Sequence, residues 1–226
     1  MLSAALVFAL VGSRQETAPP DTTPATQPPV VFEAPRGPAA DFFPVLPGSQ
    51  WSYEETERGS RRRSVFLDEA EDPVMVGGKP AFVVATRVSG GPRQRTYYRI
   101  EGDQVFVVGY QPDEPLADPI PILQASDKRT DWVFTGETVF ARDKVPMTMR
   151  GSARRVGMRT ILGERRECLE VTLEATVAAA GNFALRNKQV AVYARGIGLV
   201  EMKETGEIGE RKYERTRKLV TFRLGP

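Results

Sequence analysis

Apolar and polar side chains alternate over short stretches from residue 50 to the end of the chain. Trp51 and Tyr53 alternate with Ser52 and Glu54, which is the period of a strand with one buried face. Segment 167–175 shows the clearest pattern, because apolar residues occupy every second position: Leu169, Val171, Leu173 and Ala175. Clusters of glycine, proline and charged residues separate these stretches and indicate turns. The pattern predicts ten to twelve short strands.

Short connections between these strands favour antiparallel pairing, because parallel strands need long crossovers. Segments 94–100 and 104–110 flank Glu101-Gly102-Asp103 and predict a hairpin. The four prolines of segment 111–121 predict a loop, since proline cannot donate a hydrogen bond to a strand ladder. No stretch shows a convincing amphipathic helical period. We therefore predict a single all-β domain in which a strongly curved antiparallel sheet forms a half-barrel or a sandwich.

The first 40 residues differ in composition from the rest of the chain. Residues 1–13 contain an apolar run, Leu2 to Gly12, that is too short to span a bilayer and resembles the core of a signal peptide. Residues 14–40 are rich in proline and threonine and predict a disordered linker, because they cannot bury enough apolar surface. The β domain then covers 41–226. This organisation predicts an exported, periplasmic or extracellular protein without an integral membrane span.

Composition argues against several functional classes. Histidine is absent, which removes the commonest general base and the commonest zinc-binding nitrogen. The formal net charge of +2 is too small to predict a face that binds nucleic acid. Cys168 is the single cysteine and has no histidine to activate it, so we expect a plain strand residue. The sequence therefore predicts no catalytic residue, no metal site and no cofactor.

Charged clusters leave two further hypotheses open. Arg61, Arg62 and Arg63 would make weak contact with an anionic surface, although a solvated strand edge is the favoured interpretation of such a run. Acidic residues cluster at 68–72 and 113–118 without the spacing of a metal-binding loop, and we expect solvated loops there. A carboxylate pair that hydrolyses glycosides also stays open, because the separation of two carboxylates is a property of the fold.

Two short motifs stand at the beginning and near the end of the predicted domain, FPVLPGSQWSY at 43–53 and YARGIGLVEMKE at 193–204. Together they resemble a loose group of uncharacterised bacterial secreted proteins and lipoproteins. The resemblance implies a curved β-sheet in the cell envelope over residues 42–226, and it implies no catalytic residue. Such sheets are also distantly similar to the half-barrels of periplasmic lipoprotein carriers, which bind acyl chains on a concave face. The matching residues are Pro44, Leu46, Gly48, Trp51, Tyr53, Tyr193, Gly196, Gly198, Leu199 and Val200.

These observations favour a non-enzymatic envelope domain that acts as a binding or interaction module. Its partner would be an envelope protein or an apolar small molecule held on a concave sheet face. Two alternatives remain: a carboxylate-dependent hydrolase of envelope polymers, and a purely structural spacer. The residues expected to line the concave face are large aromatics and methionines: Trp51, Tyr53, Trp132, Phe134, Met147 and Met149.

Overall fold

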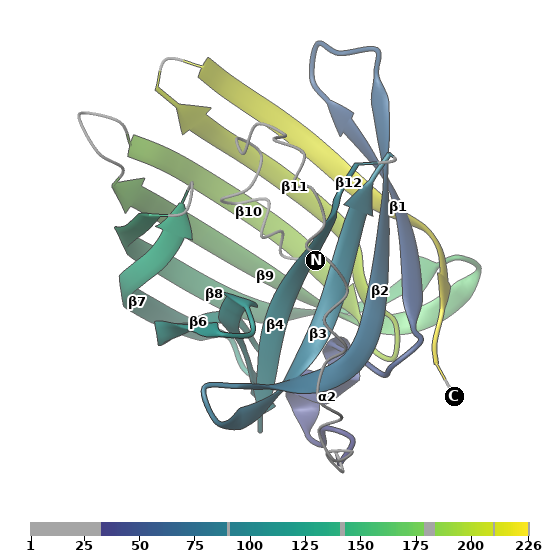
Figure 1. Cartoon of the computed structure of the whole chain (residues 1–226). Helices are drawn as coiled ribbons and strands as arrows, with labels where there is room; N and C mark the ends of the chain where they lie inside the picture. The colour runs from purple at the N-terminus through teal and green to yellow at the C-terminus, as the bar shows by residue number, and fades with distance from the viewer. Residues whose placement is uncertain (1–32, 90, 141–142, 179–183, 210, 226) are drawn as a thin grey trace.

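A computed structural model describes residues 33–226 except 90, 141–142, 179–183, 210 and 226. It contains a five-residue helix, α2 (Pro38–Phe42), followed by twelve strands (Figure 1). The strands are β1 (Gln50–Glu57), β2 (Arg63–Val76), β3 (Lys79–Val88), β4 (Arg93–Glu101), β5 (Gln104–Gln111), β6 (Glu114–Gln124), β7 (Thr130–Phe140), β8 (Asp143–Ile161), β9 (Glu164–Ala178), β10 (Ala184–Ala194), β11 (Gly198–Ile208) and β12 (Arg211–Arg223). The predicted all-β class and the predicted number of strands are confirmed.

All twelve strands belong to one antiparallel sheet whose order is β6-β5-β4-β3-β2-β1-β12-β11-β10-β9-β8-β7. Two six-stranded meanders are therefore joined where the first strand pairs with the last. The sheet curls into a nearly closed barrel (Figure 1). Its two edges, β6 and β7, approach each other without a ladder of backbone hydrogen bonds. A side chain bridges them instead, since Trp132 Nε1 donates to the carbonyl oxygen of Pro121 over 3.2 Å.

The inside of this barrel is filled by the apolar residues that the alternation places on one face. Trp51 and Tyr53 on β1 belong to a continuous core with Leu169, Val171 and Leu173 on β9. The two-residue period in the sequence therefore identified the inward face of both strands correctly. Each strand sends its alternate residues outward, so the outer face of the sheet carries most of the charged side chains.

The two motifs at the beginning and end of the domain contact each other. Trp51 Nε1 donates to the carbonyl oxygen of Ile197 over 2.6 Å, although the two residues are 146 positions apart. Gly198 adopts φ +99°, a conformation that favours glycine, and lies against Pro44 and Trp51. The motifs are thus two halves of one structural junction where the chain enters β1 and turns from β10 into β11.

Helix α2 extends this junction and crosses the predicted boundary between linker and domain at residue 40. Phe42 is fully buried, and the guanidinium groups of Arg155 and Arg195 lie over its ring at 4.5 and 5.3 Å. Asp41 pairs with Arg195 over 2.6 Å, and its carbonyl oxygen accepts a hydrogen bond from Gly196. Ala39 is fully buried as well, so helix α2 packs against the sheet on both sides of residue 40.

The loop predicted over 111–121 is wrong for its C-terminal part, because β6 begins at Glu114 and contains Pro115, Pro119 and Pro121. Proline is tolerated here for a physical reason. β6 is the edge of the sheet, and an edge strand has N–H groups that no neighbour needs. Its pairing with β5 is interrupted by three register shifts, which accommodate the missing donors.

The predicted signal-like segment, 1–13, lies outside the described residues, as does the predicted linker up to residue 32. Over the part of the chain that the structure describes, no helix has the length and apolar character needed to cross a membrane.

Candidate functional site

A buried ion pair lies inside the barrel between β1 and β12. Arg217 is only 1% exposed, and its Nε and one terminal nitrogen donate to the same oxygen of Glu55 over 3.1 and 2.7 Å. The guanidinium also lies 3.6 Å from the centre of the Phe66 ring. Glu55 is two residues after Tyr53, so strand alternation places its carboxylate on the core face.

A second polar cluster lies beside it on β10, β11 and β12. Glu204 accepts hydrogen bonds from Asn187 and from the Tyr213 hydroxyl over 2.5 and 3.1 Å. Burial raises the pKa of Glu204, and its two hydrogen-bond donors oppose that shift only in part. Burial also raises the pKa of Tyr213 to about 12, with the neighbouring Glu204 charge acting in the same direction. A buried acid with a raised pKa is a feature to test for function.

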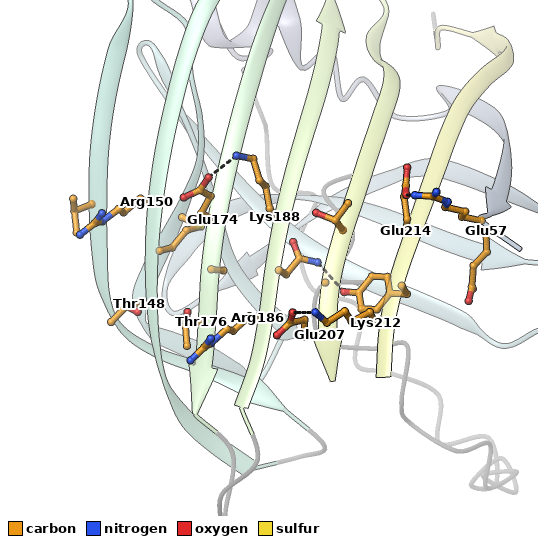
Figure 2. A pocket seen from close by; sticks show the side chains of 18 of the residues that line it. Glu57, Thr148, Arg150, Glu174, Thr176, Arg186, Lys188, Glu207, Lys212 and Glu214 are labelled. Carbon is orange, nitrogen blue, oxygen red and sulfur yellow. Dashed lines mark hydrogen bonds and ion pairs between the residues drawn. The ribbon is translucent and has the colours of Figure 1, made fainter. Parts of the chain in front are cut away.

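A groove of about 1040 Å³ crosses β7 to β12 (Figure 2). Alternation and register divide its lining into rows that run across the sheet. Two rows hold outward-facing side chains, and the residues between them belong to the inward-facing row that includes Ala175, Asn187 and Tyr213. Because that middle row points into the barrel, its backbone forms the floor of the groove.

Charged groups of both signs alternate along each row. The first row contains Arg150, Glu174, Lys188, Thr205 and Glu214; the second contains Thr148, Thr176, Arg186, Glu207 and Lys212. Figure 2 shows Lys188 directed towards Glu174 and Lys212 towards Glu207, and these pairs are 2.7 and 3.2 Å long. At the β12 end of the groove, Arg58 holds Glu214 over 2.9 Å.

Two guanidinium groups in the groove differ from the other charges. Arg150 and Arg186 are exposed, and among the described residues neither has an acidic group within ion-pair distance. They lie on neighbouring rows beside the hydroxyl groups of Thr148 and Thr176. A planar guanidinium can bind a carboxylate or phosphate through two parallel hydrogen bonds. The groove therefore offers two free anion-binding side chains among charges that are already neutralised.

The buried acid Glu204 cannot act in this groove. Its side chain points into the barrel, on the opposite side of the sheet from Thr205 and Glu207. The groove's own acids Glu174, Glu207 and Glu214 are each held by a cation. Among the described residues, no three acidic or cysteine side chains gather as they would to hold a metal ion.

The six residues expected to line a binding face lie in the interior. Trp51, Tyr53, Phe134, Met147 and Met149 are buried, and Trp132 packs against them while half-buried. Of the six, only Met149 also borders the groove. Binding of an apolar ligand by these residues stays a prediction, and it would require a packed core to open.

The charged clusters singled out from the sequence lie elsewhere. Arg61 and Arg62 are exposed at the turn before β2, and Arg63 pairs with Glu54 over 3.3 Å. The acidic segment 68–72 is not the solvated loop that was predicted, since it lies within β2, where Asp68 is buried. Cys168 is also fully buried, in a small cluster on the outer face, and burial raises the pKa of its thiol.

Sequence reasoning missed the groove because its rows are assembled from five strands. Each strand contributes one or two polar residues that are ordinary for an outward face. The sequence did contain one signal. In segments 145–177 and 185–214, the positions that alternate with core residues are often threonine or charged residues of both signs. Only the register between strands shows which of these residues become neighbours.

No protein-family model matches the chain, and no curated protein matches it. Among solved structures, the fold is similar to "a putative lipoprotein from Parabacteroides distasonis ATCC 8503", with a TM-score of 0.50, 10% identity, and coverage of 80% of this chain and 98% of that chain. A second match is "a putative exported protein with YmcC-like fold" from Bacteroides fragilis NCTC 9343, with a TM-score of 0.41, 8% identity, and coverage of 79% and 96%. At such low identity, the first likeness shows a shared fold.

Proposed function

We propose that this chain is a non-catalytic binding domain of the bacterial cell envelope, and that its groove binds an extended acidic segment of a partner protein. The observation that carries the proposal is the pair of unpartnered guanidinium groups, Arg150 and Arg186, in a groove of about 1040 Å³. Export to the envelope is part of the proposal. It is supported by the apolar segment 1–13 and by a fold shared with a structure described as a lipoprotein.

The groove suits an extended chain better than a compact molecule. It crosses six adjacent strands, β7 to β12, and neighbouring side chains within each row are one strand spacing apart, about 4.8 Å. Carboxylates of a bound segment could pair with the two free arginines without disturbing the ion pairs around them. Most of the residues that line the groove are charged or polar, so an apolar ligand would desolvate charged groups without compensation.

A binding role also agrees with the chemistry that the groove contains. Each acid in the two rows is paired with a cation, and the chain has no histidine to act as a general base. A hydrolase would need one free carboxylate and one acid aligned on a substrate.

The test uses the purified full-length chain and fluorescently labelled poly-L-glutamate as the probe, with binding followed by anisotropy. Replacing both free arginines, in R150Q/R186Q, should weaken binding by about tenfold or more, since two charge-assisted contacts are lost. The matched control is R61Q/R62Q, which removes the same charge from an exposed turn outside the groove. The control should bind the probe nearly as tightly as the unmodified protein.

Equal losses in the two double variants would show that binding follows net charge, and the groove proposal would then be abandoned. Loss of binding in R61Q/R62Q alone would instead assign the anionic contact to the basic turn before β2. Thermal unfolding of every variant must be measured alongside, although all four arginines are exposed and their replacement should change stability little.

A further inference from the structure

The hairpin formed by β8 and β9 extends beyond the strands on either side. The ladder between β7 and β8 ends at Ala153, and the ladder between β9 and β10 ends at Cys168. A hydrogen bond from the Arg195 N–H to the carbonyl oxygen of Glu167 lies at the base of the hairpin, and residues 158–166 continue beyond it as a two-stranded ribbon. β8 and β9, with 19 and 15 residues, are the longest of the described strands.

The turn at the end of this ribbon contains a residue that the turn itself disfavours. Leu162 and Gly163 both have positive φ, +48° and +90°. Asparagine, aspartate or glycine is preferred at such positions, because a side chain like leucine crowds the backbone there. Leu162 is also 53% exposed, so core packing does not compensate. Neither the turn geometry nor core packing therefore accounts for a leucine at this position.

Other apolar groups surround this leucine on the outer face. Met158 is 52% exposed on the same ribbon. Beside the ribbon is a groove of about 280 Å³, and its apolar lining comes from Ile161, Leu162, Val192, Val200 and Leu219. Ile161 packs against the outer-face cluster around Cys168 and Val192, which leaves Leu162 and Met158 as exposed apolar groups of the ribbon. Exposed apolar groups gathered at one end mark an interaction site.

Basic side chains flank the apolar groups. Arg159 lines the groove and Arg165 is exposed on the other strand of the ribbon, and among the described residues neither has an acidic group within ion-pair distance. Lys218 lies on the opposite rim of the groove, where its ammonium group is 3.9 Å from the Glu201 carboxylate. The tip therefore combines apolar side chains with two guanidinium groups, Arg159 and Arg165, that pair with no acid among the described residues.

We propose that the β8–β9 tip docks on the surface of a bilayer that contains anionic phospholipids. Leu162 and Met158 would enter the boundary between headgroups and acyl chains, while Arg159 and Arg165 bind lipid phosphates. At a bilayer interface, apolar side chains lie deepest and cations lie around them at the level of the phosphates, and the tip would have the same order. Two exposed apolar side chains, Leu162 and Met158, suit a lipid surface better than a protein, because stable protein interfaces need about 800 Å² per partner.

The site is separate from the proposed acidic-segment groove, which lies near the opposite ends of the same strands. The two proposals can therefore fail independently. The full-length chain is sedimented with vesicles of phosphatidylcholine alone and with vesicles that also contain phosphatidylglycerol. Unmodified protein should bind the anionic vesicles, and binding should fall as salt is added, because headgroup attraction is screened.

Leu162→Asn is the decisive variant, since asparagine suits the left-handed turn and should leave the thermal midpoint unchanged or higher. It should weaken binding to anionic vesicles by about tenfold, the loss expected for one leucine that no longer enters the apolar layer. Arg165→Gln should cost about fivefold, one surface charge. The matched controls are V133N, at an exposed apolar residue of the acidic-segment groove, and R150Q/R186Q. Both controls should bind as the unmodified protein does.

Three outcomes would overturn the proposal: no binding of unmodified protein to anionic vesicles, equal binding by L162N and V133N, or loss of binding in R61Q/R62Q while L162N is unaffected. Vesicle binding that survives in R150Q/R186Q while poly-L-glutamate binding is lost would support both proposals as separate sites.

Discussion

The buried pair between Glu55 and Arg217 gives the sharpest prediction about stability. Arg217→Met removes the guanidinium and keeps an apolar chain of similar length against Phe66. The Glu55 carboxylate, whose side chain is 10% exposed, is then left in the core without its cation. Removal of one member of a buried pair costs about 3–5 kcal/mol, because the remaining charge has no compensation. We expect R217M to lose that much unfolding free energy.

The same reasoning predicts a small effect when both charges are removed. E55L/R217M replaces the pair with apolar side chains of similar size, a change that is often neutral or stabilising. The double variant should therefore be more stable than R217M by roughly 3 kcal/mol or more. A domain of this size would show the R217M defect as a fall of roughly 6–20 °C in thermal midpoint.

Urea unfolding of the full-length chain, followed by tryptophan fluorescence, measures these values. The control is R58M, which breaks the pair with Glu214, where the two side chains are 82% and 47% exposed. Exposed pairs contribute at most about 1 kcal/mol, so R58M should change little. A loss below about 1 kcal/mol in R217M, or a double variant as unstable as the sum of its singles, would refute the reasoning.

Two further predictions concern the junction and the buried acid. Gly198→Ala should lower the free energy of unfolding in urea by about 1–2 kcal/mol. The cost comes from the backbone, because φ is +99° there and the new methyl group would meet Pro44 only at ordinary contact distance. A change below about 0.5 kcal/mol would contradict this reasoning. The pKa of Glu204 is raised in the fold, so its contribution is fully present below its ordinary pKa of 4.5 and is lost as pH rises through the raised value. E204Q should therefore gain stability relative to the unmodified protein as pH rises from about 4; parallel stability curves for the two proteins would argue against it.

The sequence was sufficient to predict the fold class, because alternation is a local property of each strand. Trp51, Tyr53 and Leu169 all lie on the predicted inward face. The prolines of β6 misled the prediction, since only sheet order reveals that they occupy an edge.

The sites depend on information that spans the chain. Arg150 and Arg186 become neighbours only through the register of β8, β9 and β10. The position of Glu55 two residues after Tyr53 did signal an inward carboxylate. Its partner, 162 residues further along, could not be recognised before the pairing of β1 with β12 was known.

That pairing of β1 with β12 has a consequence for how the molecule reaches its fold. Within each meander, every strand pairs with its neighbour in sequence, so those contacts close short loops. The ladder between the meanders joins Gln50 to Arg223, and nearly the whole domain lies between them. Closing it carries the largest entropic cost of any step, and such non-local pairing slows folding. In a circular permutant that begins at β7 and ends at β6, the order of the strands along the chain would match their order in the sheet. The same barrel would then be a plain meander, without its one long-range ladder.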